Sequence, residues 1–170
     1  MGMAARRLES VVEHLASRPG HETVRTLIAE MCVNALDIPQ SDVEFEIRVP
    51  EVRGRIDGLF GSTVFEFKRD LRRESDDAEE QLTRYLTERE RSTGRRYLGV
   101  ATDGADFVAY QIANGDLQKL GSFAPSVEDP RALLRWLDRS VTVRGDIVPS
   151  AETIREEFGR GSIAFNRALG

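Results

Sequence analysis

The segment that most constrains the fold is 54–68, in which two apolar stretches are separated by only Gly61 and Ser62. Gly followed by Ser is favoured in a two-residue type II′ turn, because glycine adopts positive φ without steric cost. The spacing predicts antiparallel strands at 54–60 and 63–68. The fold is therefore expected to contain a tight β-hairpin near the middle of the chain.

This register brings two acids together. Counting back from the turn, Asp57 is expected to lie directly opposite Glu66. Opposed residues have Cβ atoms about 4.5–5.5 Å apart, and like charges there are destabilising. Residues two apart on a strand share a face, so Lys68 is expected beside the two acids. The opposite, core-facing side is predicted to carry only apolar side chains: Ile56, Phe60, Phe65 and Phe67.

A bound divalent cation would explain why Asp57, Glu66 and Lys68 share one face. Hard oxygen ligands suit Mg²⁺, with Mn²⁺ as its usual substitute, and the cation cancels the repulsion between the acids. A bound cation also acidifies water, which Lys68 would orient or help deprotonate, or Lys68 would stabilise charge on a phosphate. The pattern is typical of metal-dependent phosphodiester hydrolysis. The alternative is a surface cluster of charges that only solvates a sheet.

The segments before the hairpin predict a helix followed by a strand. Apolar residues at spacings of three and four predict an amphipathic helix from Glu22 to Leu36, ended by Pro39. The alternating sequence at 43–49 predicts a half-buried strand, ended by Pro50.

A second helix is expected directly after the hairpin. In the segment 72–92, Ser75 is predicted to cap a helix whose first turn is rich in Asp and Glu, and Gly94 is predicted to end it. Its apolar face is predicted to be Ala78, Leu82, Tyr85 and Leu86.

The remainder of the chain predicts further strands and then helices. A buried strand is expected at 97–102, with 106–112 pairing either with it or with a short strand at 118–123. Pro130 is predicted to start a helix, and a last helix is expected at 150–159. The fold class is α/β, with a core at 1–125 and a helical extension or linker at 126–170.

At this point the sequence RIDGLFGSTVFEFK (55–68) resembles the PD-(D/E)xK nuclease superfamily. Asp57 matches the first acid of the motif, and Glu66 and Lys68 match its ExK pair. Ile56 stands where the motif name has proline, which that superfamily can dispense with. The resemblance implies a restriction-endonuclease-like core in the order αβββαβ, with a mixed central sheet flanked by helices.

The resemblance also suggests supporting site residues. Gln81 matches a glutamine that many restriction-type members carry on the helix after the motif, although it is equally well explained as a solvent-facing residue. Glu22 matches an acid on the first helix, with Glu30 a weaker candidate for the same role. A helix-start acid favoured by the helix dipole accounts for Glu22 as well.

More narrowly, the segments 22–28, 55–68 and 78–86 look like the amino-terminal nuclease domain of type I restriction subunits and of fused type IIG restriction-modification enzymes. The tail at 149–169 is similar to the linker before the methyltransferase portion of the fused class. The resemblance implies DNA as substrate, a methyltransferase or translocase domain or subunit as partner, and a homodimer as one allowed assembly. No methyltransferase tetrapeptide or P-loop is found, and GRGSIA at 159–164 is not preceded by a strand.

Composition narrows these expectations. The 24 basic residues comprise 22 Arg and two Lys, so Lys68 is unlike an ordinary surface charge of this chain. Guanidinium is a poor substitute for a compact ammonium beside a metal-bound water. The net charge of −5 and a pI near 5.2 argue for weak unaided DNA affinity. The single Cys32 excludes an internal disulfide and is predicted to be a buried apolar residue. His14 and His21 have no ligand-spaced partners and are expected on the surface.

Charged residues interrupt every apolar run near the start, and no stretch reaches the roughly 18 apolar residues of a membrane span. A soluble, cytoplasmic protein without membrane contact is expected. Arginines also cluster at two places. The group just after the hairpin, Arg69, Arg72 and Arg73, either meets DNA phosphates or lies in a solvated loop. The later group, Arg89, Arg91, Arg95 and Arg96, is expected to pair with Glu88 and Glu90.

Two functional hypotheses follow. In the first, the chain is a Mg²⁺-dependent DNA endonuclease domain in which Asp57, Glu66 and the main-chain carbonyl of Phe67 bind the metal. Lys68 positions water or stabilises charge, and Gln81 and Glu22 contribute less directly. In the second, the same fold is a catalytically inactive docking or DNA-contact module whose acids bind no metal.

Overall fold

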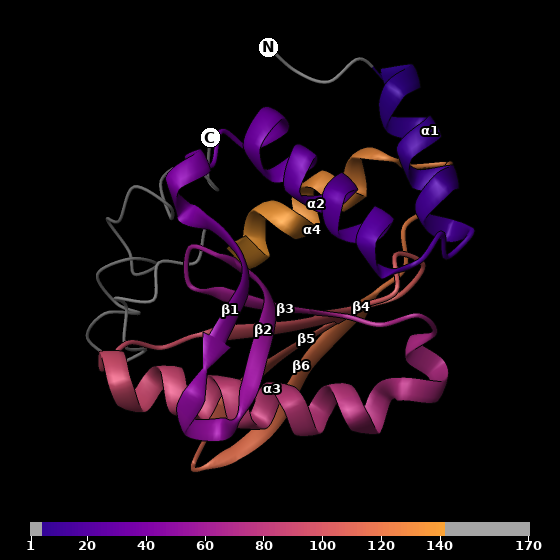
Figure 1. Cartoon of the computed structure of the whole chain (residues 1–170). Coiled ribbons are helices and arrows are strands. Elements are labelled where there is room, and N and C mark those ends of the chain that lie inside the picture. Colours follow the sequence, from indigo (N-terminus) through magenta and orange to yellow (C-terminus); the bar gives the residue numbers. More distant parts are fainter. Residues whose placement is uncertain (1–4, 142–170) are drawn as a thin grey trace, which may run out of the picture.

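The structure is a computed structural model and describes residues 5–141 (Figure 1). The predicted helix at 150–159 and the GRGSIA segment lie outside this range. The helices are α1 (Ala5–Ala16), α2 (His21–Ala35), α3 (Leu71–Thr93) and α4 (Arg131–Val141), with two short 3₁₀ turns, η1 (Gln40–Asp42) and η2 (Pro50–Val52). The strands are β1 (Val43–Val49), β2 (Gly54–Phe60), β3 (Thr63–Phe67), β4 (Leu98–Thr102), β5 (Phe107–Ala113) and β6 (Asp116–Phe123).

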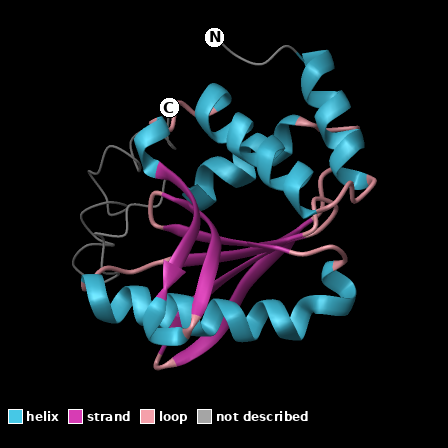
Figure 2. Ribbon diagram, viewed as in Figure 1, coloured by secondary structure: helices cyan, strands magenta, loops and turns pink. Residues whose placement is uncertain are grey.

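All six strands form one mixed sheet in the order β1-β2-β3-β4-β5-β6. Only β3 and β4 are parallel, because α3 connects them as a crossover, and every other neighbouring pair is antiparallel. β5 pairs with both β4 and β6, so both alternatives predicted for 106–112 occur. Helices α1, α2 and α4 cover one face of the sheet and α3 covers the other (Figure 2). The predicted α/β class with a helix-flanked mixed sheet is confirmed.

Each face of the sheet has its own apolar core. The core under α1, α2 and α4 includes the aromatic side chains Phe60, Phe65 and Phe107, all fully buried. The core under α3 contains the four residues predicted for its apolar face: Ala78, Leu82, Tyr85 and Leu86. Burying one large apolar side chain stabilises by about 1.5–3 kcal/mol, so the two layers hold the sheet rigidly between them.

Helix α1 was not predicted, because the segment was considered only as a signal sequence. Its buried residues are Leu8, Val12 and Leu15, at the spacings of four and three that mark an amphipathic helix. Helix α2 and strand β1 match their predicted positions. Cys32 lies in α2, fully buried, and burial raises the pKa of its thiol to about 12.

The start of α3 differs from the prediction of a cap at Ser75. The helix begins at Leu71, and the side chain of Asp70 accepts a hydrogen bond from the N–H of Arg72. Glu74 has a non-helical backbone and its carboxylate accepts the N–H groups of Arg69 and Asp70, so the helix bends just before Ser75. The predicted end at Gly94 is confirmed, since Gly94 caps the helix with φ of 68°.

The hairpin register near the turn is as predicted, with Phe60 opposite Thr63 and Gly58 opposite Phe65. Of the two turn residues only Gly61 has positive φ (59°), as a type II′ turn requires.

The prediction that Ile56 shares the core face of Phe60 is wrong. Ile56 packs in the core under α3, whereas Phe60 packs in the core under α2. The reason lies one strand away: Glu46 has a left-handed backbone (φ 54°), and the β1–β2 ladder has no pair between Glu46 and Asp57. This break reverses which side chains face each layer, and it falls at Asp57.

No helix within residues 5–141 is both long and apolar enough to cross a membrane.

Candidate active site

The three residues of the predicted motif lie together at one end of the hairpin. Asp57 is on β2, Glu66 is on β3 and Lys68 directly follows β3. The ammonium of Lys68 donates to Glu66 Oε1 at 2.7 Å. Glu66 and Lys68 are buried, with exposed fractions of 2% and 7%, so this is an ion pair inside the protein.

Asp57 and Glu66 do not form the predicted ladder pair. The β2–β3 ladder ends at Gly58 and Phe65, and beyond it the N–H of Phe67 donates to Asp57 Oδ2 at 3.0 Å. A side-chain carboxylate therefore takes the place of a strand carbonyl, which fixes Asp57 against β3. Burial raises the pKa of Asp57, and the Phe67 N–H and the charge of Lys68 oppose this effect without cancelling it.

Glu66 is the least satisfied acid of the site. Its Oε1 accepts from Lys68, but its buried Oε2 has no hydrogen-bond partner within the described residues. Burial and the nearby charge of Asp57 raise the pKa of Glu66 to about 7. An unpaired buried carboxylate oxygen is costly, so a further ligand for this atom would stabilise the folded protein.

Lys68 is also bound by a residue that the sequence analysis missed. Its ammonium donates to Asp77 Oδ2 at 2.6 Å, and the amide of Gln81 donates to the same oxygen at 2.7 Å. Both residues lie on α3, one helical turn apart, so Gln81 reaches Lys68 through Asp77. The spacing of four between Asp77 and Gln81, on the helix that follows the motif, is the signal that could have identified Asp77.

These contacts determine the charge of Lys68. Burial alone would lower its pKa, but the hydrogen bonds to Asp77 and Glu66 outweigh burial and raise the pKa of Lys68 above its ordinary value. The same contacts with Lys68 and Gln81 lower the pKa of Asp77. In this arrangement Lys68 is a charged hydrogen-bond donor. An ammonium has three N–H groups and two are used, so one remains to hold water or a phosphate oxygen.

Glu22 and Glu30 lie apart from this cluster on α2. Glu22 is exposed and pairs with Arg25, and His21 Nε2 lies 3.3 Å from its carboxylate. Within the described residues, Glu22 has no hydrogen bond or ion pair to Asp57, Glu66 or Lys68. From α2, the charges of His21 and Arg25 add to those of the Phe67 N–H and Lys68 in opposing the raised pKa of Asp57. Glu30 is about two turns farther along the helix and pairs with Arg7 at 3.6 Å.

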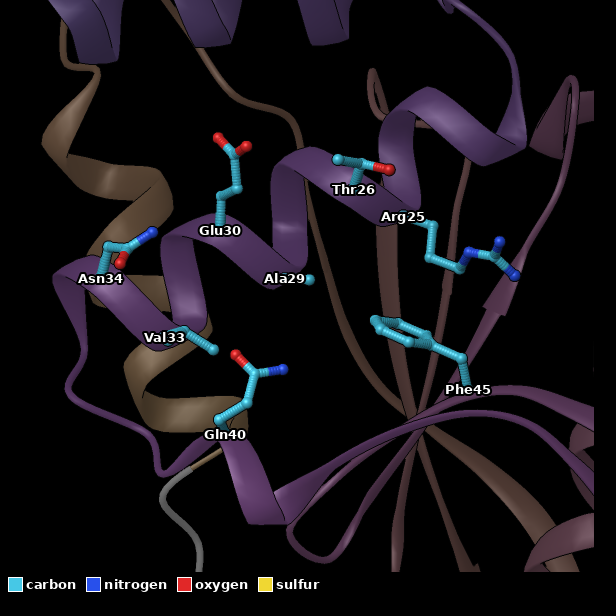
Figure 3. A pocket seen from close by; sticks show the side chains of 8 residues that line it. All are labelled: Arg25, Thr26, Ala29, Glu30, Val33, Asn34, Gln40 and Phe45. Atoms are coloured by element: carbon cyan, nitrogen blue, oxygen red, sulfur yellow. The ribbon is translucent and has the colours of Figure 1, made fainter.

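A groove of about 320 Å³ runs between α2 and β1 beside this region (Figure 3). At its end near the site the guanidinium of Arg25 lies over the ring of Phe45, 5.2 Å from its centre. Glu30 and Asn34 line the part farther along α2. The groove therefore ends at the contact between Arg25 and Phe45. Glu66 is not one of its described lining residues.

The donor set fits a divalent cation bound through few protein ligands. Within residues 5–141 no three His, Cys, Asp or Glu side chains come together as a metal-binding group. Asp57 and Glu66, with the main-chain carbonyl of Phe67, are the groups that would hold such a cation. Mg²⁺ commonly uses one or two carboxylates and takes its other ligands from water and substrate phosphates. The buried Glu66 Oε2 without a hydrogen-bond partner is an acceptor that a cation of this kind would satisfy.

A second buried acid, also missed from the sequence, holds the surrounding elements in place. Asp103, 1% exposed, follows β4 and accepts four hydrogen bonds, two on each carboxylate oxygen. The donors are Arg18 Nε and the N–H of Leu71 on Oδ2, and the N–H groups of Ala105 and Asp106 on Oδ1. Asp103 therefore joins the α1–α2 loop to the start of α3, the helix that carries Asp77 and Gln81.

Within the described residues, two arginines of each predicted basic cluster form ion pairs, whereas Arg89 lies over the ring of Tyr97 in place of the predicted pair with Glu88 or Glu90. Arg72 and Arg73 both lie close to Asp70, at 3.1 and 3.6 Å, and Arg69 is exposed. Farther along, the expected surface pairs form between Arg91 and Glu88 and between Arg96 and Glu90. His14 and His21 are exposed, as predicted.

Searches against models of protein families, curated proteins and solved structures find no match.

Proposed function

We propose that this chain is a Mg²⁺-dependent DNA endonuclease domain of the PD-(D/E)xK type. The observation that carries the proposal is the buried Lys68–Glu66 ion pair beside Asp57, with Glu66 Oε2 unpaired. The order α2, β1, β2, β3, α3, β4 agrees with the core order expected from the resemblance. DNA as substrate, a restriction-modification role, a methyltransferase or translocase partner, homodimerisation and a cytoplasmic location belong to the same proposal.

Asp57, Glu66 and the carbonyl of Phe67 would hold the cation. When bound there, the cation supplies Lewis-acid stabilisation of charge on the scissile phosphate. Lys68 directs its remaining N–H at the attacking water or a phosphate oxygen and stabilises the negative charge that grows as the water oxygen bonds to phosphorus and the leaving oxygen departs. Asp77 and Gln81 keep Lys68 charged and fix its position.

Cleavage of a supercoiled plasmid in Mg²⁺ or Mn²⁺ tests the proposal. We expect the native chain to cleave, and Lys68→Ala and Asp57→Ala to lose activity by at least 100-fold. Lys119→Ala is the matched control, because Lys119 is the only other lysine and is exposed on β6. Equal activity in all four proteins would refute the assignment. Melting curves establish that each variant is folded.

A non-catalytic docking or DNA-contact module is the second candidate. The observation favouring it is that Lys68 is already neutralised by Glu66 and Asp77, while only two carboxylates are available for a metal within residues 5–141. Titration with Mn²⁺ while following the melting temperature separates the candidates, because a ligand bound only by the folded state raises it. A rise that disappears in Glu66→Ala rejects this candidate. No rise, together with no cleavage, supports it.

A further inference from the structure

A hollow at the end of the sheet where η2 joins β1 to β2 is lined by three arginines. Its lining residues are Arg48, Pro50, Arg53, Gly54 and Arg55, and its volume is about 490 Å³. No carboxylate of the described part of the chain lines it, although the whole chain has a net charge of −5. Three guanidinium groups around one hollow create a local positive potential that the overall charge does not predict.

Two of these cations have no partner within the part of the chain that the structure describes. Arg55 shares Glu46, at 3.4 Å, with Arg25. The side chains of Arg48 and Arg53 are exposed and make no hydrogen bond or ion pair there. Exposed arginines that are close together repel each other weakly, so an anion that contacts both would be bound favourably.

The backbone of Arg53 supports the same conclusion. Arg53 ends η2 in a left-handed conformation, with φ of 49° and ψ of 39°. This conformation costs free energy for any residue with a Cβ and suits glycine. Arginine at this position therefore stabilises the turn less than glycine would, and its side chain gains nothing from the described protein.

The hollow is held in a fixed relation to the candidate active site. Arg55 lies two residues before Asp57 on β2, roughly 7 Å along the strand. The N–H of Arg55 donates to the hydroxyl of Tyr85 on α3, at 3.2 Å. Gly54 allows this contact, since a Cβ there would lie 2.5 Å from the Tyr85 ring. Tyr85 is one turn beyond Gln81, so one helix positions both the hollow and the residues around Lys68.

We propose that Arg48, Arg53 and Arg55 form a binding surface for the phosphate backbone of double-stranded DNA, next to the site of cleavage. The inference rests on the proposed function for the identity of the polyanion. Guanidinium groups bind phosphate oxygens through paired N–H donors. Contacts of this kind place a duplex on the protein without reading its sequence.

Fluorescence anisotropy of a labelled 20-base-pair duplex tests the surface, in EDTA so that cleavage cannot occur. We expect Arg48→Gln/Arg53→Gln to weaken binding at least tenfold at 25 mM NaCl. The slope of log affinity against log salt should become shallower by about 2, one for each lost phosphate contact. The matched control is Arg131→Gln/Arg139→Gln on α4, which makes the same charge change on the opposite layer and should leave both quantities nearly unchanged.

One further variant separates a role in DNA binding from a role in stability, because the two roles predict changes of opposite sign in the melting temperature. Arg53→Gly should weaken DNA binding while raising the melting temperature by a few degrees, because it removes the cost of the left-handed backbone. A fall in both quantities would assign Arg53 to stability and count against the surface.

The inference would be overturned if the native chain did not bind the duplex at low salt, or if the two double variants lost the same amount of duplex affinity. It would also be overturned if Arg48 and Arg53 supported binding to phosphatidylserine vesicles without duplex binding. Plasmid cleavage is measured separately. Cleavage with unaltered binding by Arg48→Gln/Arg53→Gln refutes the surface and leaves the nuclease proposal intact. Arginine-dependent binding without cleavage refutes the nuclease proposal and leaves the surface intact.

Discussion

Two buried acids have different surroundings: Glu66 on β3, and Asp103 directly after the neighbouring parallel strand β4. Asp103 follows β4 and accepts four hydrogen bonds, so each carboxylate oxygen has two donors. Glu66 lies on β3, is equally buried, and accepts one hydrogen bond on Oε1 and none on Oε2 within the described residues. Within the described residues, the fold thus satisfies both oxygens of Asp103 and leaves one buried oxygen of Glu66 without a hydrogen-bond partner.

This difference in hydrogen bonding indicates that Asp103 is a structural acid and that Glu66 is a candidate functional acid. Asp103 fixes the start of α3 through the N–H of Leu71, and α3 then presents Asp77 and Gln81 to Lys68. Glu66 lowers stability in its charged state, because burial of an incompletely paired carboxylate is unfavourable. A protein tolerates such a group when a bound ligand relieves the cost. The comparison predicts opposite consequences when each acid is removed.

The largest effect is expected from Asp103→Ala. Removal of this carboxylate leaves Arg18 without its most buried partner and orphans the N–H groups of Leu71, Ala105 and Asp106. Breaking a buried charge network of this kind costs about 3–5 kcal/mol. Urea denaturation measures the loss. Asp106→Asn is the control, since Asp106 is partly exposed and, within residues 5–141, its side chain accepts only from Arg18. If Asp103→Ala lowered the free energy of unfolding no more than this control does, Asp103 could not be distinguished from Glu66 as a structural acid.

A smaller effect, of opposite direction, is expected at Glu66 as pH rises. Its pKa of about 7 in the folded protein exceeds the ordinary 4.5, so between these values the folded state binds more protons than the unfolded state. Stability in EDTA should therefore fall from pH 5 to pH 8, by about 1–3 kcal/mol. Asp57 contributes with the same sign. Urea denaturation of Glu66→Gln should show most of this decline removed. A decline as steep as in the native chain would place the titration elsewhere.

Cation binding should depend on pH for the same reason. A proton on Glu66 competes with the metal, so the apparent affinity for Mg²⁺ is expected to be roughly tenfold weaker at pH 6 than at pH 8, about 1.4 kcal/mol. The affinity is obtained from the melting temperature as Mg²⁺ is titrated at each pH. Asp106→Asn should bind as the native chain does. Affinity that is the same at both pH values would show that the cation does not use Glu66.

Much of this contrast was not accessible from the sequence, while most of the fold was. Periodicity and the Gly61–Ser62 turn predicted α2, the hairpin, α3 and the strands that follow, because these signals are local. The face of Ile56 was predicted wrongly because the left-handed Glu46 acts from the neighbouring strand. A uniform alternation cannot reveal such a break.

The site was predictable only in part for a similar reason. The motif residues were found through their spacing, but Asp103 lies 35 positions beyond Lys68 and its role depends on Arg18 and the start of α3, which only the folded chain brings together. Asp77 was hidden among five acids in the run from Glu74 to Glu80. Glu22 matched the motif by position, yet in the folded chain it pairs with Arg25 and not with the cluster.

The smallest effect on stability is expected at Asp77, and it tests whether the Lys68 cluster serves function more than folding. The Asp77 side chain is 59% exposed, so its ion pair with Lys68 is screened by solvent and Asp77→Asn should change the free energy of unfolding by less than about 1 kcal/mol. Lys68 nevertheless loses one of its two anchors, and a misplaced ammonium stabilises the transition state less well. We expect plasmid cleavage to fall roughly tenfold, which corresponds to about 1.4 kcal/mol in the barrier. Asp76→Asn is the adjacent control, because Asp76 is exposed and, among the described residues, its carboxylate accepts a hydrogen bond only from Ser75. Unchanged cleavage in Asp77→Asn would confine the working part of the site to Asp57, Glu66 and Lys68.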